Sequence, residues 1–208
     1  AVIFLVVMVS VLTSVDTVSG EIASHSIQSI VTKPLRRRDV LLGKWLGFAA
    51  MIAGYVLLLA GGVILIAWGI SGYAPPNPVQ GLALMILEGL VLLSLTLLGG
   101  TRFSTLTNGV LVFMLFGLAF MGSWTEQIGA FAGNEAAVNM GIISGLIMPT
   151  EVLWRRAAYL MQPSFLNSLP VSPFAVGSVP SPAMILYAVL YGVAALAGAI
   201  YIFERRDL

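Results

Sequence analysis

The stretch SGEIASHSIQSIVTKPLRRRDVLLGKW, residues Ser19 to Trp45, is a dense group of charges in a chain that is otherwise almost entirely apolar. Only 9% of the 208 residues are charged, 59% are hydrophobic, and the mean hydropathy is +1.00. Soluble domains carry about 25% charged residues. The composition therefore indicates an integral membrane protein that holds this stretch outside the bilayer.

The side chains that bind metals and carry redox chemistry are nearly missing from the sequence. There is no cysteine, which removes disulfides and thiolate sites, and the single His25 cannot build a histidine-based zinc centre. We therefore expect this chain to bind no metal and no cofactor. We also expect no nucleic-acid partner, although the net charge of +1 does not decide this; what matters is where the positive charges lie.

Apolar runs on both sides of the charged stretch predict membrane helices. The first run, residues 1–15, would cover only about 22 Å of a hydrocarbon core that is roughly 30 Å thick, so we interpret it as a truncated span. Because the sequence begins at Ala1 without an initiator Met, we expect a further helix upstream. The runs that are long enough to span are 45–70, 82–100, 103–123 and 183–203.

The distribution of basic residues predicts the orientation. If residues 16–44 are cytoplasmic, that side holds eight of the ten basic residues, and the outer side keeps only Arg155 and Arg156. We therefore expect a multi-pass protein of the cell membrane, surrounded by its lipids, with the tail 204–208 in the cytoplasm.

The segment 124–182 is too polar and too interrupted by proline to be predicted as a simple span. Thr150 is a candidate N-cap for a helix that reaches Met161, with Arg155 and Arg156 on the side opposite its apolar residues. Two interpretations stay open. Short amphipathic helices dip into the outer leaflet, or they only cap the bundle.

Within the opening stretch, periodicity predicts a helix of about three turns. Ser19 is a candidate N-cap, Glu21 suits the first turn, and Lys33-Pro34 ends the helix, since a residue before proline avoids the α region. The apolar residues at i, i+4, i+7 and i+8 are Ala23, Ile27, Ile30 and Val31.

A second helix is expected to begin at Asp39 and to run through Lys44 into the next span. The run Arg36 to Arg38 then lies at the lipid headgroups, where each charge contributes roughly 1 kcal/mol of attraction to anionic lipid. Periodicity alone leaves two roles open for the stretch. It is a helix on the bilayer surface with a topology-setting basic cluster, or a docking helix that transmits a push from a partner.

Several short motifs, taken together, resemble the permease subunits of the ABC type-2 transporter family. The similarity extends over nearly the whole chain. Its elements are Asp16, SGE at 19–21, KPLRR at 33–37, LLGKW at 41–45, TLTNG at 105–109, PTEVLWRRAAYLMQP at 149–163 and FERRDL at 203–208.

The resemblance implies an all-α, polytopic transmembrane bundle with the six-helix architecture of ABC type-2 permeases, of which five spans are visible here. It implies a coupling helix in the cytoplasmic loop, over residues 19–32, docked on a separate ABC ATPase subunit that binds ATP and Mg²⁺. It also implies a second permease subunit, so that a homodimer forms the translocation path, and it favours export. The coupling residues that it implies are Ser19, Gly20, Glu21, Ile22, Ile27, Ile30, Lys33, Pro34, Arg36 and Arg37.

The sequence carries no catalytic motif of its own. The only GK pair, Gly43-Lys44, has Arg38 where a phosphate-binding loop needs its first glycine, and Trp45 where it needs Ser or Thr. The spans contain neither a nucleophile with a base nor paired aspartates. We therefore expect no enzyme activity in this chain and ATP hydrolysis on the partner.

Glu88 is the one ionisable residue well inside a predicted span, and such residues are functional candidates because they are costly in lipid. Two roles stay open: an interhelical hydrogen bond, with Ser94, Thr96 or a neighbouring helix, or a place on the translocation path. Two other functions also stay open for the whole chain. It is a non-transporting membrane anchor or signalling subunit for an ATPase, or a secondary transporter, which the lack of repeated halves disfavours.

Overall fold

The computed structural model describes residues 2–23, 36–163 and 179–205. Over these residues the chain is helical and contains no strand, which confirms the predicted all-α class. The helices in chain order are α1 (Val2–Ala23), α3 (Arg37–Val56), the π-helix η1 (Leu57–Gly61), α4 (Gly62–Ser71), α5 (Pro78–Gly100), α6 (Thr105–Ala132), α7 (Glu135–Ile147), α8 (Thr150–Met161) and α10 (Ala183–Glu204).

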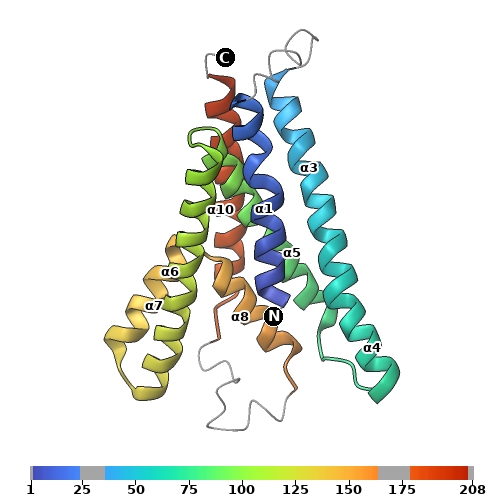
Figure 1. Cartoon of the computed structure of the whole chain (residues 1–208). Coiled ribbons are helices and arrows are strands. Elements are labelled where there is room, and N and C mark those ends of the chain that lie inside the picture. The colour runs from blue at the N-terminus through green and yellow to red at the C-terminus, as the bar shows by residue number, and fades with distance from the viewer. Residues whose placement is uncertain (1, 24–35, 164–178, 206–208) are drawn as a thin grey trace.

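Helix α5 lies at the centre of the bundle and is contacted by α1, α3, α6, α8 and α10 (Figure 1). In its most apolar stretch 61% of the residues are buried, against 17–22% in the three other candidate spans. Gly89 permits this crowding, because a Cβ there would lie 2.6 Å from Ile52 Cγ2 of α3 and 3.0 Å from Ser10 Oγ of α1. Small residues of this kind let membrane helices approach closely.

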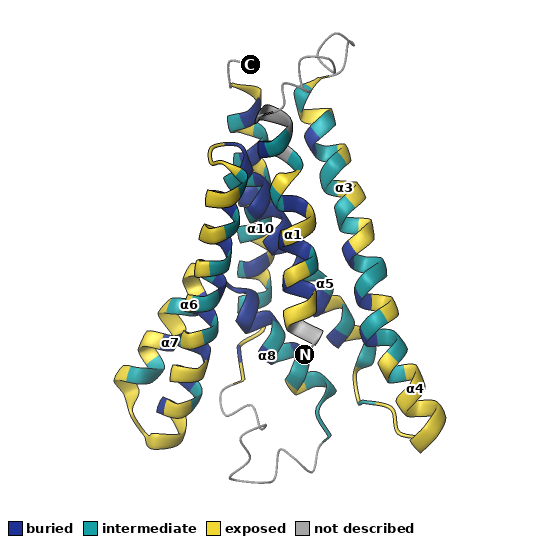
Figure 2. Cartoon of the chain, viewed as in Figure 1, coloured by how far each residue is buried: buried dark blue, intermediate teal, exposed yellow. Residues whose placement is uncertain are grey.

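Within the described residues, four helices are long and apolar enough to cross a membrane: Arg37–Ser71, Pro78–Gly100, Thr105–Ala132 and Ala183–Glu204. They overlap the four long runs that the sequence predicts, although the helix of the run 103–123 begins only at Thr105. The truncated first run corresponds to a shorter apolar helix, Phe4–Thr17, within α1. Figure 2 shows exposed residues over α4 and the far ends of α6 and α7, while buried residues gather along α1, α5 and α8.

Helix α1 continues beyond the predicted end of the first span. It includes Asp16 and ends at Ala23, so the predicted loop start at residue 16 is wrong. Ser19 lies inside the helix and is not an N-cap, since its Oγ donates to the Val15 carbonyl at 2.9 Å in the preceding turn. Glu21 accordingly lies in the last turn of α1 and not in the first turn of a new helix.

The next helix is continuous through α3, η1 and α4 over 35 residues. At 1.5 Å per residue this is about 52 Å, so one end extends well past a hydrocarbon core of roughly 30 Å. The predicted continuity from the basic run into the span is confirmed. The predicted cap is wrong, because Arg36 is the N-cap and Asp39 lies in the first turn, where its charge still favours the helix dipole.

Helices α6 and α7 form a tightly packed antiparallel pair. Helix α6 passes the predicted end at residue 123 and stops only at Gly133, whose φ of 67° is the left-handed conformation that glycine adopts most easily. A Cβ at Gly141 would lie 2.3 Å from Glu126 Cβ and 2.6 Å from the Gly122 carbonyl oxygen. The glycine therefore sets the close approach of the two helices.

Helix α8 turns back into the bundle after Met148 and Pro149, at 107° to α7. Together α7 and α8 pass the length and apolarity test for one membrane span, broken at this bend. Thr150 is the first residue of α8 and not its N-cap, a position that Pro149 occupies. Helix α8 packs against α5, so the prediction that its arginines lie opposite the buried face is wrong for Arg155.

Candidate functional site

A buried ion pair joins α6 and α8 in the interior of the bundle. Arg155 Nη2 donates to Glu126 Oε2 at 2.7 Å, and both side chains are almost fully buried. Glu126 is positioned by the face of α6 that packs on Gly141, and Arg155 by the turn of α8 that packs on α5 and α6. The pair compensates two charges that would otherwise be very costly in this environment.

The start of α8 brings further polar groups into the same interior. Thr150 and Glu151 are buried in its first turn, where the backbone N–H groups of a helix lack intrahelical partners. Thr150 Oγ1 and Glu151 Oε1 have no hydrogen-bond partner, nor do Nε and Nη1 of Arg155. Buried groups without partners are rare in proteins and are therefore candidates for function.

Glu88 on α5 is fully buried, and neither of its carboxylate oxygens has a hydrogen-bond partner. The predicted bond to Ser94 or Thr96 is wrong, because both hydroxyls donate instead to carbonyls of their own helix, those of Leu90 and Leu92. Glu151 is also buried, in the first turn of α8, and α8 packs directly on α5, the helix that carries Glu88. Glu88, Glu126, Glu151 and Arg155 thus form a buried polar cluster in the bundle.

Sequence reasoning found Glu88 in this cluster and missed the other three residues. The signal for Glu126 is its spacing from Gly122 and Gly129, which places an acid on the small-residue face of one helix. In the described residues no group of three His, Cys, Asp or Glu is arranged to hold a metal ion.

The predicted coupling residues are divided by the structure. Ser19, Gly20, Glu21 and Ile22 form the last turns of α1, whereas Arg36 and Arg37 begin α3. Ile27, Ile30, Lys33 and Pro34 lie outside the described residues. The two helix ends are at the same end of the molecule as the end of α10 (Figure 1).

Several polar contacts hold this end of the bundle together. Thr105 Oγ1 donates to Asp16 Oδ1 at 2.7 Å and lies 2.8 Å from Ser19 Oγ, which joins α6 to α1. Lys44 Nζ donates to the Thr17 carbonyl at 3.1 Å, which joins α3 to α1. The C-terminal part of α1 is therefore hydrogen-bonded to both α3 and α6 at this end of the bundle.

The comparison with protein-family models gives a match over residues 1–208 to the family described as ABC-2 family transporter protein. The chain belongs to the ABC-2 transporter family. It is a membrane permease of an ABC transporter, as the short motifs predict. Searches of curated proteins and of solved structures each returned no match.

Membership in the ABC-2 family bears on the end of the bundle where the basic residues lie. Members of the family associate in general with an ABC ATPase. The described basic residues outside α8 lie at the start of α3, in the turn between α5 and α6, and after α10, which all meet at one end of the bundle (Figure 1). These positive charges are therefore gathered at one end of the bundle.

Proposed function

We propose that this ABC-2 permease forms the translocation path of an exporter and couples to a separate cytoplasmic ABC ATPase through residues 16–44. The observation that carries the proposal is the family match over the whole chain. The arrangement of α1 and α3 supports it, because α1 ends and α3 begins at the basic end of the bundle, where the two helices contact each other. ATP and Mg²⁺ belong to the partner in this proposal, and a second copy of the permease completes the path.

The support for a mechanical link lies in the contacts of the two helix ends. A force on the segment between Ala23 and Arg36 would pass into α1 and α3, which are tied by Lys44 to Thr17. Trp45, the next residue, donates from Nε1 to Ser94 Oγ of α5 at 3.0 Å, so α3 is also hydrogen-bonded to the central helix. Movement of the segment would therefore reach the core of the bundle directly.

Glu88 is our candidate for a residue on the path. Its support is full burial in the central helix without a hydrogen-bond partner, a costly arrangement that function can maintain. The apolar character of the spans suits a hydrophobic or amphiphilic cargo.

Co-purification tests the partner. The full-length permease is co-expressed with ABC ATPase subunits, purified through its own tag in mild detergent, and compared with an Ile27→Asp, Ile30→Asp variant. We expect an ATPase to copurify with the wild type and to be lost from the variant. The matched control is Ile70→Asp, Val79→Asp, two exposed aliphatic positions at the end of α4 and the start of α5. Retention of the ATPase by the first variant, or its absence from the wild type, would contradict the proposal.

A further inference from the structure

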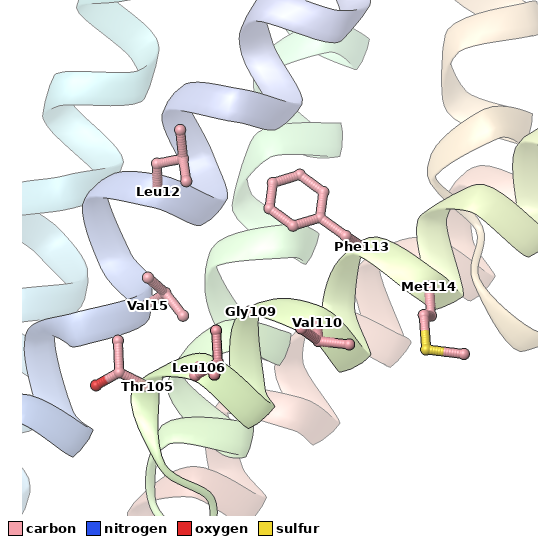
Figure 3. Close-up of a pocket in the computed structure, with 8 residues that line it drawn as sticks. All are labelled: Leu12, Val15, Thr105, Leu106, Gly109, Val110, Phe113 and Met114. Atoms are coloured by element: carbon pink, nitrogen blue, oxygen red, sulfur yellow. The ribbon is translucent and has the colours of Figure 1, made fainter.

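A groove of about 530 Å³ lies between α1 and α6. Figure 3 shows Leu12 and Val15 on α1 and Phe113 on α6 around the space between the two helices. Gly109 contributes no side chain to it, and a Cβ there would lie 3.4 Å from Val15 Cγ2. Apart from one hydroxyl, the lining is apolar: Leu12, Val15, Thr105, Leu106, Gly109, Val110, Phe113 and Met114.

The groove opens to the side of the bundle and not to its interior. Leu12 is 59% exposed, Leu106 80% and Met114 60%. Helix α6 is long and apolar enough to cross a membrane, and α1 carries the shorter apolar stretch Phe4–Thr17, so we infer that the opening faces lipid. A volume of this size lies in the range of pockets that hold small ligands.

One end of the groove is polar and carries an exposed carboxylate. Leu12 and Asp16 lie four residues apart on α1, which places them on one face of the helix. At that end Thr105 lines the groove and donates to Asp16 Oδ1. The negative charge of Asp16 therefore lies where the groove reaches the basic end of the bundle.

A positive charge lies near the same end. Arg102 is exposed in the turn before α6, three residues before Thr105, so their Cα atoms are at most about 11 Å apart. One end of the groove thus carries the Asp16 carboxylate, Arg102 lies only three residues from Thr105 of the same end, and the apolar lining leads away from them.

We propose that this groove binds an acyl chain of a zwitterionic phospholipid with a primary ammonium, phosphatidylethanolamine, whose ammonium contacts Asp16 and whose phosphate lies at Arg102. Charge complementarity selects this headgroup. A phosphatidylglycerol headgroup offers Arg102 the same phosphate but gives Asp16 only neutral hydroxyls in place of an ammonium, and a choline headgroup has no N–H to donate to the carboxylate. The proposal is independent of any ATPase partner.

Native mass spectrometry of the full-length permease in detergent tests it, with phosphatidylethanolamine, phosphatidylcholine and phosphatidylglycerol of identical acyl chains. We expect the wild type to bind phosphatidylethanolamine most tightly. Asp16→Asn keeps an acceptor for Thr105 but removes the charge, and should lower that affinity about tenfold and abolish the preference. Gly109→Leu fills the groove and should weaken binding of all three lipids.

The matched control for the filled groove is Gly117→Leu, two turns further along α6, where nothing lies within 4 Å of an added Cβ. It should bind lipid as the wild type does. If Gly109→Leu does not fold, Val110→Phe fills the same groove from an exposed lining position. The proposal would be overturned if the wild type bound the three lipids equally or preferred phosphatidylglycerol, or if filling the groove left binding undiminished. It would also be overturned if the permease were found as a dimer that carries no lipid, because a second copy would then cover the groove.

Discussion

Arg155 and Glu126 form a 2.7 Å ion pair across 29 positions of sequence, with both side chains almost fully buried between α6 and α8. Three elements depend on it. Helix α8 enters the bundle at a bend of 107° to α7, and α7 in turn packs closely along α6. The ion pair therefore connects α8 directly to α6, the helix on which α7 packs.

Removing one partner of the ion pair should destabilise the protein strongly. Arg155→Met or Glu126→Leu alone leaves an uncompensated buried charge, at a cost of about 3–5 kcal/mol in the free energy of unfolding. The double variant, which buries no charge at these positions, should recover most of that loss. Unfolding of all four proteins in detergent with increasing dodecyl sulfate measures the coupling. Additive losses in the double variant would show that the two residues do not act as a pair.

Gly141→Ala tests the close approach of α6 and α7. The added Cβ would meet Glu126 Cβ and the Gly122 carbonyl oxygen at distances that packed atoms do not adopt, so α7 must shift. We expect a loss of about 1–3 kcal/mol from overpacking. Gly117→Ala is the matched control, because its Cβ meets nothing within 4 Å and should stabilise α6 by about 0.5–1 kcal/mol. Equal stability of the two variants by thermal unfolding would contradict the prediction.

Glu88→Leu separates stability from function. The carboxyl group has no hydrogen bond to lose, so an apolar replacement should stabilise the bundle by about 1–3 kcal/mol. If Glu88 lies on the translocation path, the same change should lower the ATPase activity of the reconstituted complex. Glu88→Gln, which keeps a polar group in place, is compared in both assays. A loss of stability in Glu88→Leu would show that the carboxyl makes a favourable contact in the folded protein.

Trp45→Phe probes the link between α3 and the central helix. The change removes the 3.0 Å hydrogen bond from Nε1 to Ser94 Oγ and keeps an aromatic ring. We expect a loss of about 1 kcal/mol in the free energy of unfolding. Trp68→Phe is the control, since that side chain is 58% exposed on α4, and it should change stability by less than about 0.5 kcal/mol. Indistinguishable melting curves for the two variants would show that this hydrogen bond does not contribute to stability.

The long spans and the basic end could be predicted from the sequence because both signals are local. A run such as 82–100 is apolar apart from Glu88 and two hydroxyl residues, and the requirement to satisfy its backbone in lipid makes it helical wherever it packs. The ends of the helices could be predicted less well from the sequence. Serine is a residue type that often caps helices, but no helix-breaking residue precedes Ser19, and α1 continues through it.

The tertiary structure alone decided which polar residues meet. Arg155 follows Trp154 in a helix whose pattern is amphipathic, so its sequence neighbours indicate an outward-facing arginine. Its burial depends on α8 turning into the bundle after Pro149 and on Glu126 being presented by α6, and neither condition is recorded near residue 155. The energy of a buried charge is set by the groups that surround it in space. For the same reason the sequence identified Glu88 as costly, while only the packing around α5 showed that nothing hydrogen-bonds to it.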